Sequence, residues 1–438
     1  MKHTSVIIST YTADVSGVCS ALYELGGMVV IHDPSGCNST YNTHDEPRWY
    51  DQDSLIFISG LSEMDAIMGN DDKLIGDIVR AAGDLSPRFI ALVRAPVPMM
   101  TGVDFEAIRY LVEKETGIPT WYFPTDGMHS YIQGVNMALA AVAKHMVLDA
   151  ETSAQTKVTP LIEGSGQSRM TPLSESSGHI KVNLLGVTPL DFSVGETLPS
   201  IRRMAYDHGY RIQSCLAMGS SYDEIAGAGK ARVNLVLSSA GIDAARVLKE
   251  RFGTPYVVGL PTGAFAEIVF AAMADSLESG RDHIVYQEPD FVSAAQQESC
   301  KIGHSTKLVT KKLSLIEDNR FLTRQKEGRI YLIGEAVTAG SVREAARLEY
   351  GLDLKVLCGL ETPRDLLDEG CETLLSEEEM QKRLADADVV IADPLYRPIC
   401  PENVSFIPFP HEAFSGRIYR DRIPDLTRPE QIIYNHTG

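Results

Sequence analysis

Cysteine is the residue type of this sequence best suited to holding a metal centre. Seven cysteines occur, at positions 19, 37, 215, 300, 358, 371 and 400. They form no CxxC pair and their number is odd, so neither a disulfide framework nor a zinc knuckle within one chain fits the pattern. A metal centre bound through thiolates would therefore need further ligands from another chain.

Among these cysteines, Cys37 has the placement most favourable to chemistry. It follows the apolar run Met28 to Ile31, which is typical of a strand buried on both faces in a parallel sheet. Pro34 and Gly36 predict a tight turn between that strand and the thiol. Loops after parallel strands commonly carry ligand-binding residues, whereas a lone cysteine is most often a small buried hydrophobic residue. The position by itself leaves both interpretations open.

Two glycine-containing segments, "SGLSEMDAIMGNDDKL" and "GAGKA", invite comparison with phosphate-binding loops. Neither contains GxxxxGK followed by Ser or Thr, and neither opens a helix with GxGxxG directly after a strand. The sequence therefore predicts no nucleotide site in this chain, and any ATP hydrolysis would fall to a separate protein.

The charge balance excludes one class of partner. In the 438-residue chain, 59 acidic residues outnumber 40 basic ones, which gives a formal net charge of -19. Such a surface repels a phosphate backbone, so no nucleic-acid partner is predicted. No apolar run approaches the roughly 18–20 residues of a membrane helix, and the N-terminus lacks a signal-peptide pattern. We therefore expect a cytoplasmic protein without a membrane partner.

Short apolar runs alternate with helical patterns through three stretches of the chain. That alternation is typical of βαβ units, with a parallel sheet and helices on both faces. The sequence thus predicts an α/β fold of three doubly wound, Rossmann-like units. The predicted boundaries are residues 1–150 for the N-terminal unit that carries Cys37, 151–178 for a linker, 179–290 for the second unit, 291–327 for a connecting segment and 328–438 for the third unit.

Several segments carry a family resemblance. In the first unit they are "VVIHDPSGC" (29–37), "MTGVDFEAI" (100–108) and "TDGMHSYIQG" (125–134), and in the second "SSYDEIAGAGKARVNLVLSS" and "LKERFGTPYVVGLPTG". In this order and spacing, the chain resembles the component 1 superfamily of nitrogenase over nearly its whole length. That superfamily includes nitrogenase, its cofactor-assembly scaffold, the dark-operative protochlorophyllide reductase and the enzyme that reduces the precursor of a nickel tetrapyrrole in methanogens. The resemblance implies three units around a central cleft.

The chain also departs from the superfamily's pattern. Subunits that hold a full cluster carry three cysteines, of which only the second is in place here, as Cys37. The other two positions fall near Thr10 to Thr12 and near Pro96 to Pro98. This pattern resembles the single-ligand subunits, which complete a cluster held mostly by a partner. Where nitrogenase anchors its active-site cofactor, this chain has Ser238, so the resemblance implies a relative and not nitrogenase proper.

The resemblance implies roles for particular residues. Cys37 would ligate an iron–sulfur cluster of the 4Fe-4S type shared across a subunit interface. Cys19 is a second candidate ligand, although its place within a helical pattern also fits a core residue. His32 would donate a hydrogen bond to a cluster sulfur or be a satisfied strand-end histidine, and the side chain of Asp33 would cap the turn. His411 would help to shape the active-site cavity or be an ordinary loop residue.

Two functions of different classes follow from the resemblance. The first is an oxidoreductase subunit that relays electrons from an ATP-dependent iron–sulfur reductase, through the interfacial cluster, to a small-molecule substrate. Its partner would be a second component 1-like subunit or its own copy. The alternative is a non-redox scaffold or binding protein for a metal chelate, a tetrapyrrole or a cofactor precursor in an interdomain cleft.

Overall fold

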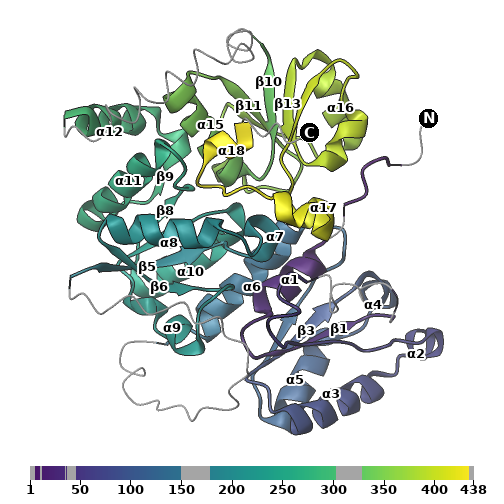
Figure 1. Ribbon diagram of the computed structural model, residues 1–438. Helices are drawn as coiled ribbons and strands as arrows, with labels where there is room; N and C mark the ends of the chain where they lie inside the picture. The colour runs from purple at the N-terminus through teal and green to yellow at the C-terminus, as the bar shows by residue number, and fades with distance from the viewer. Residues whose placement is uncertain are drawn as a thin grey trace.

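The structure is a computed structural model that describes residues 5–9, 12–34, 36, 46–148, 178–301 and 328–433; within the range 178–301, side chains are described up to residue 295. Three parallel sheets with flanking helices form three α/β units, which confirms the predicted fold class (Figure 1). Cys37, most of the predicted linker and most of the predicted connecting segment lie outside the described residues.

The first sheet has the strand order β2-β1-β3-β4. Its strands are β1 (Met28–His32), β2 (Leu55–Ile58), β3 (Ile90–Arg94) and β4 (Thr120–Phe123). The helices of this unit are α1 (Asp14–Leu22), α2 (Glu63–Met68), α3 (Asp71–Leu85), α4 (Pro96–Thr101), α5 (Phe105–Thr116) and α6 (Tyr131–His145). Side chains of β1 alternate between two cores: Val29 and Ile31 pack with α1 and α6, and Met28 and Val30 with α3 and α5. Because both faces are covered, the strand is apolar throughout.

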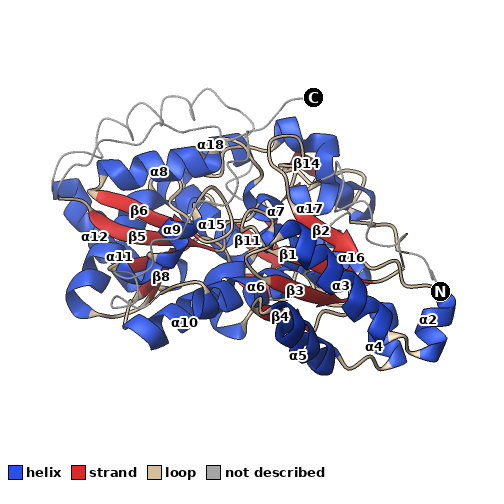
Figure 2. Ribbon diagram, turned by 90° about the horizontal axis from the view of Figure 1, so that it is seen from below, coloured by secondary structure: helices blue, strands red, loops and turns tan. Residues whose placement is uncertain are grey.

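The second sheet has the order β6-β5-β7-β8-β9. Its strands are β5 (Ile180–Leu185), β6 (Tyr210–Cys215), β7 (Val233–Val236), β8 (Tyr256–Val258) and β9 (His283–Ile284). Its helices are α7 (Pro189–Phe192), α8 (Thr197–Asp207), α9 (Tyr222–Ala226), η2 (Ala228–Lys230), η3 (Ser239–Gly241), α10 (Ile242–Phe252), α11 (Phe265–Ser279), η4 (Val285–Gln287) and α12 (Pro289–Lys301). Figure 2 shows α8 and α10 on opposite sides of this sheet.

The third sheet has the order β12-β11-β10-β13-β14. Its strands are β10 (Ile330–Ile333), β11 (Leu354–Cys358), β12 (Cys371–Thr373), β13 (Val389–Ala392) and β14 (Ser405–Pro408). Its helices are α15 (Ala336–Tyr350), η5 (Arg364–Leu366), α16 (Glu377–Arg383), η6 (Leu384–Asp386), η7 (Pro394–Ile399), α17 (Glu412–Ser415), η8 (Gly416–Arg422) and α18 (Pro429–Ile433). All strand pairs of the three sheets are parallel.

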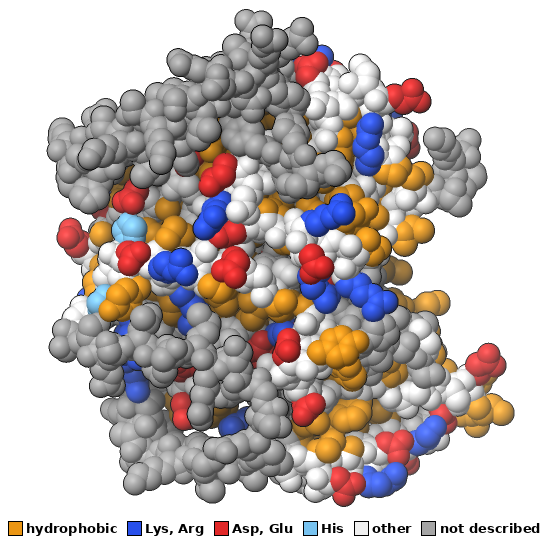
Figure 3. All heavy atoms as spheres, in the orientation of Figure 1, with side chains coloured by type: hydrophobic (Ala, Val, Ile, Leu, Met, Phe, Trp, Pro, Cys, Tyr) orange, Lys and Arg blue, Asp and Glu red, His pale blue; other side chains and the backbone are white. Residues whose placement is uncertain are grey.

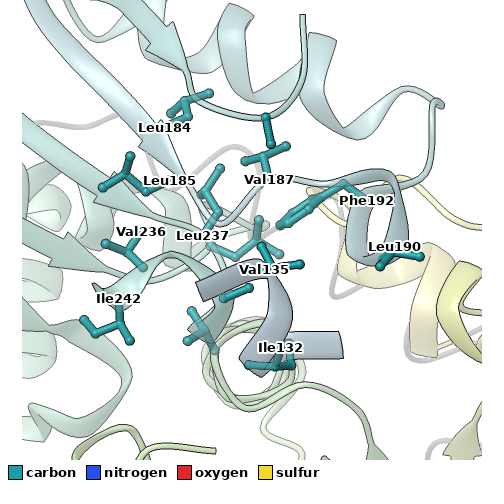
Figure 4. Close-up of a cluster of buried hydrophobic side chains, with 14 of the residues drawn as sticks. Ile132, Val135, Leu184, Leu185, Val187, Leu190, Phe192, Val236, Leu237 and Ile242 are labelled. Atoms are coloured by element: carbon teal, nitrogen blue, oxygen red, sulfur yellow. The ribbon is translucent and has the colours of Figure 1, made fainter. Parts of the chain in front are cut away.

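Helix α6 joins the first unit to the second. It packs against α1 on one side and against α10 and η3 on the other. The contact with α1 is close enough to require glycine, since a Cβ atom on Gly17 would lie 2.1 Å from the Tyr131 carbonyl oxygen. Toward the second unit, Ile132 and Val135 of α6 enter the apolar cluster at the ends of β5 and β7 (Figure 4). The units therefore share one continuous core.

Candidate functional site

The strand orders mark one place in each sheet where the direction of winding reverses. These switch points lie between β1 and β3, between β5 and β7, and between β10 and β13. Open parallel sheets bind ligands just beyond the carboxyl ends of their strands at this place, because the loops there diverge and leave a crevice. The predicted cluster residue Cys37 follows β1 in the sequence and lies outside the described residues.

The second and third switch points meet at Glu335. This residue follows β10, and its carboxylate accepts the backbone N–H of Ser239, after β7, at 2.8 Å. It also caps α15 by accepting the N–H groups of Val337 at 3.1 Å and Thr338 at 2.9 Å. Burial raises the pKa of the Glu335 carboxyl, and the N–H donors oppose that shift. A fixed, buried acid thus links the second and third sheets.

Asp393, directly after β13, fixes the other side of the third switch point. Its carboxylate accepts the N–H of Leu395 at 2.9 Å, the N–H of His411 at 2.8 Å and the hydroxyl of Ser415 at 2.6 Å. Burial raises the pKa of Asp393. The backbone of His411 is therefore held in place by the neighbouring strand end.

Residues of all three units meet at Asp191, in the short helix α7 after β5. The buried Tyr131 hydroxyl of α6 donates to Asp191 Oδ1, and His411 Nε2 lies 3.3 Å from the same oxygen. Burial raises the pKa of Tyr131 well above its usual value, so the phenol remains a donor. Asp191 Oδ2 is buried and makes no hydrogen bond with any described residue. The site therefore has one unused acceptor.

A small cavity opens beside these groups. Its volume is about 20 Å³, and Asp191, Glu335, Asp393 and His411 contribute the carboxyl and imidazole groups of its lining. The remaining lining is mostly apolar, including Ile333, Leu360, Phe409, Phe414, Ile423 and Leu426. A volume above roughly 10–15 Å³ with polar partners accommodates one water molecule.

A larger groove of about 370 Å³ runs between the first and third units. It shares Gly359, Leu360, Tyr396 and Phe414 with the lining of the small cavity, so the two spaces adjoin. Glu361 of the third unit crosses the groove by accepting the N–H of Ser130 at 3.0 Å. Of the two spaces, only the groove has the capacity to admit a small organic molecule.

One group of possible metal ligands is found among the described residues. It comprises Asp14, Asp126 and His129, the last of which lines the groove. Asp14 already accepts the N–H groups of Val15, Asp126 and Gly127, which fix the start of α1 against the loop before α6. Asp126 in turn accepts a hydrogen bond from His129 and raises the pKa of that imidazole. These hydrogen bonds explain why the three side chains lie together, since they hold the start of α1 against the loop before α6.

The remaining sequence-predicted residues lie apart from the cavity. His32 is buried at the end of β1, its Nδ1 lies 2.8 Å from Ser59 Oγ, and burial lowers its pKa to about 4. Asp33 is buried and donates its backbone N–H to Ser59 Oγ. Cys19 is fully buried within α1, and burial raises the pKa of its thiol. The Ser238 hydroxyl is also buried and donates to the Gly186 carbonyl at 2.7 Å.

Sequence reasoning left His411 open between a cavity residue and an ordinary loop residue, and it missed the acids that surround it. Asp191, Glu335 and Asp393 each follow an apolar strand within a few residues, in "LLGVTPLD", "YLIGE" and "VVIAD". An acid just beyond an apolar run is the signal that could have identified them, because the carboxyl ends of parallel strands share one edge. No comparable pattern in the sequence indicates that Tyr131 contacts Asp191.

The first unit exposes an apolar surface. We call this the α2 surface, and its side chains are Met64, Ile67 and Met68 of α2 and Met100 of α4, the helix that contacts α2. None of the residues of α2 is buried, although three of its six are large and apolar. Figure 3 shows apolar atoms over this unit at the lower right. Exposed apolar side chains gathered on one face are typical of a protein-interaction surface.

Comparison with known proteins identifies the family. Residues 16–298 match the family model described as nitrogenase component 1 type oxidoreductase. The chain belongs to this family. The family assignment agrees with the resemblance seen in the sequence and extends over the first two units of the fold.

Curated relatives of two kinds are similar to the chain. The nitrogenase iron-molybdenum cofactor biosynthesis protein NifE of Klebsiella pneumoniae is 26% identical over 52% of this chain and 48% of its own length. A subunit of the light-independent protochlorophyllide reductase of Prosthecochloris aestuarii is 40% identical over 19% of this chain and 16% of its own length. The matches thus span about half or less of these relatives.

Solved structures of nitrogenase share the fold. The structure titled "Nitrogenase Cp1 at pH 6.5" matches 98% of this chain and 90% of its own chain, with a TM-score of 0.62 and 14% identity. "Nitrogenase Cp1 at pH 5" matches 85% of this chain and 68% of its own, with a TM-score of 0.53 and 16% identity. Among the described residues, no helix has the length and apolar character needed to cross a membrane.

Proposed function

We propose that this chain is an oxidoreductase subunit that receives electrons from a separate ATP-dependent iron–sulfur reductase and delivers them to a small-molecule substrate. The observation that carries the proposal is the meeting of all three units at Asp191 and His411, beside a groove of about 370 Å³. Membership of the nitrogenase component 1 type family supports electron transfer as the chemistry.

The electron-entry side of the proposal rests on Cys37. No group of three possible metal ligands among the described residues includes a cysteine, so those residues alone do not complete a cluster. Cys19 is a poor ligand because its thiol is fully buried and its pKa is raised, which disfavours the thiolate. The donor set therefore fits a chain that gives one thiolate, from Cys37, to a 4Fe-4S cluster completed by a partner subunit. Such a cluster would supply single electrons at the interface.

The α2 surface supports a partner at this end of the molecule. It lies on the same unit as Cys37, and its methionine side chains adapt well to an apolar partner. A second component 1-like subunit or a second copy of this chain would cover it. The ATP-dependent reductase is a further, transient partner in this proposal.

The substrate side of the proposal rests on the buried acids and His411. Reduction of an organic molecule requires a proton for each electron, and an imidazole supplies protons near neutral pH. Asp393 fixes the backbone of His411, while the Asp191 carboxylate lies 3.3 Å from its Nε2. We propose that His411 delivers protons toward the groove and that the cavity water links it to the substrate.

A second candidate function is favoured by one observation. The match to NifE of Klebsiella pneumoniae covers 52% of this chain, and that relative is named as a cofactor biosynthesis protein. The groove between the first and third units would then hold a metal chelate or a tetrapyrrole without reducing it. Both functions predict binding in the groove, and only the first requires electrons to reach it.

The deciding experiment is anaerobic purification of the full chain, alone and with the component 1-like protein of a neighbouring gene. We expect a brown protein that contains iron. The Cys37→Ser variant should lose the iron and the reductase-dependent activity while remaining folded, because loops lie outside the cores. Cys19→Ser is the matched control, and it should keep the iron.

Three results would argue against parts of the proposal. A colourless, iron-free preparation under both conditions would contradict a bound cluster. Full iron content in Cys37→Ser would exclude Cys37 as a ligand. An iron-containing protein that binds its ligand but accepts no electrons from the reductase would favour the scaffold function.

A further inference from the structure

Two thiols meet in the third unit, away from the predicted cluster residue. Cys358 is the last residue of β11 and Cys371 the first of β12, on two neighbouring parallel strands. Their Sγ atoms lie 3.0 Å apart, and both cysteines are free. Neither thiol belongs to the site proposed above.

The turn that carries Cys371 is held firmly. The Cys371 N–H donates to the Asp368 carbonyl at 3.1 Å, and the Arg343 guanidinium binds the Asp368 carboxylate through both of its terminal nitrogens. The guanidinium also packs against Gly370, where a Cβ atom would come within 2.3 Å of Arg343 Nη1. The thiol of Cys371 is therefore kept close to that of Cys358 and has little freedom to turn away.

The two thiols differ in accessibility. Cys358 is fully buried, and its hydrogen bond with Cys371 and its burial raise the pKa of its thiol. Cys371 is partly exposed at the edge of the sheet. An oxidant in solution thus reaches Cys371 first, and Cys358 is placed to react second.

The loop between these cysteines connects the third unit to the other two. Glu361 accepts the N–H of Ser130 in the first unit. Asp365 forms an ion pair with Arg246 of the second unit at 2.6 Å. The Leu366 carbonyl accepts the Tyr286 hydroxyl at 2.8 Å. The start of the loop, Gly359 to Glu361, also lines the groove. A bond between the two cysteines would therefore join the ends of a loop whose residues contact the first and second units.

We propose that Cys358 and Cys371 form a reversible disulfide that locks this loop, with hydrogen peroxide as the oxidant. The Cys371 thiolate attacks one peroxide oxygen, the O–O bond breaks, and hydroxide leaves and takes up a proton to become water. The Cys371 sulfenic acid then reacts with the Cys358 thiol, which forms the S–S bond and releases a second water. One peroxide is reduced to two waters, and two thiols are oxidised to one disulfide. A dithiol reductant reverses the reaction.

The disulfide affects the groove because the loop that it closes forms part of the groove wall. With the ends of the 359–370 loop joined, local opening of the loop costs more because fewer open conformations are available. The wall formed by Gly359 to Glu361 then stays in place, and the contacts to the first and second units persist. The disulfide is independent of the proposed cluster and is tested separately from it.

The test treats the full chain with a slight excess of hydrogen peroxide, alkylates the remaining thiols and maps the peptides by mass spectrometry. We expect a linked pair of peptides that contain Cys358 and Cys371, lighter than the two thiols by two hydrogens. Amide hydrogen exchange of residues 359–377 should slow several-fold after oxidation and return to its former rate with a dithiol. The same linkage is expected in the Cys37→Ser background, where the proposed cluster is absent.

The controls are single substitutions in the same unit. Cys371→Ser changes a partly exposed residue and should abolish both the linkage and the slowed exchange. Cys400→Ser removes another partly buried thiol of this unit, so it should leave both intact. Alkylation of both thiols after peroxide treatment, or conversion of Cys371 to a sulfinic acid without linkage, would overturn the disulfide. A linkage that leaves exchange of residues 359–377 unchanged would overturn the lock.

Discussion

The carboxyl end of the first sheet and the shared carboxyl ends of the second and third sheets are built differently. At the first, the α2 surface leaves large apolar side chains in contact with solvent. At the second, the buried acids Glu335 and Asp393 each accept several hydrogen bonds, and Asp191 Oδ2 is a buried oxygen without a hydrogen bond to a described residue. The difference indicates that the central site is organised within one chain, whereas the first unit leaves an apolar surface that, in our proposal, a partner subunit covers.

The largest effect is expected at the junction of the second and third sheets. Glu335→Ala removes the acceptor of three buried N–H groups and the cap of α15. The free energy of unfolding should fall by about 3 kcal/mol, because unpaired buried donors and a lost cap both cost stability. Urea unfolding followed by far-UV circular dichroism measures this change.

Glu335→Gln is the matched control for that prediction. An amide retains one acceptor oxygen, so the donors of Ser239 and Val337 keep their partner while Thr338 loses its own. We expect the free energy of unfolding to fall by about half as much as in Glu335→Ala. Equal stability of the alanine variant and the wild-type chain would show that the central site is not held together by this acid.

The next effect concerns pH and the end of β1. Burial lowers the pKa of His32 from 6.5 to about 4, so the folded chain keeps this imidazole neutral while the unfolded chain takes up a proton. The stability contributed by neutral His32 is complete above about pH 6.5 and is lost as the pH falls toward 4. Between about pH 7 and pH 5, the wild-type chain should lose about 2 kcal/mol more than the non-titrating His32→Gln variant.

The two tryptophans allow this change in stability to be followed in the first unit. Trp49 and Trp121 are the only ones in the chain, and both lie in the first unit. Their fluorescence during urea unfolding at the two pH values reports the unit that carries His32. If the wild-type chain and the His32→Gln variant lose the same stability between the two pH values, His32 does not cause the pH dependence.

A smaller effect is expected where the first unit reaches the central site. Tyr131→Phe removes the hydroxyl that donates to the Asp191 carboxylate, so the buried charge loses a partner. The free energy of unfolding should fall by about 2 kcal/mol, since hydrogen bonds to charged groups contribute about 1.5–3 kcal/mol. Tyr286→Phe removes a bond to the neutral Leu366 carbonyl and should cost about 1 kcal/mol. The reverse order in denaturant unfolding would contradict a larger contribution from the Tyr131 hydrogen bond.

The smallest effect on stability is expected on the α2 surface. Ile67→Lys should change the free energy of unfolding by less than about 0.5 kcal/mol, because this side chain is 79% exposed. Association with the partner subunit should nevertheless weaken by about tenfold or more. Ile418→Lys, at a similarly exposed position of the third unit, is the control. Sedimentation analysis that finds equal association for both variants would contradict a partner at the α2 surface.

The parts of the fold predicted from the sequence are those that depend on local patterns. The run Met28 to Ile31 is apolar throughout because β1 is covered on both faces, and this pattern correctly predicted a parallel sheet. The fold class and the family followed from repeated patterns of this kind and from the order of the resembling segments. His411 could be proposed because it follows the apolar run of β14. The roles of Cys37, Cys19 and His32 toward a cluster remain predictions.

What only the tertiary structure decided is which distant groups meet. Tyr131, Asp191 and His411 come from three units, and their contact depends on how α6 packs on the second sheet and on the order in which the strands pair. Likewise, the thiols of Cys358 and Cys371 lie 3.0 Å apart because β12 pairs with β11 in a particular register. Periodicity in a sequence reports which face of an element is buried, but it carries no information on which other element covers that face. Packing between elements supplies that information, and with it the chemistry of the central site.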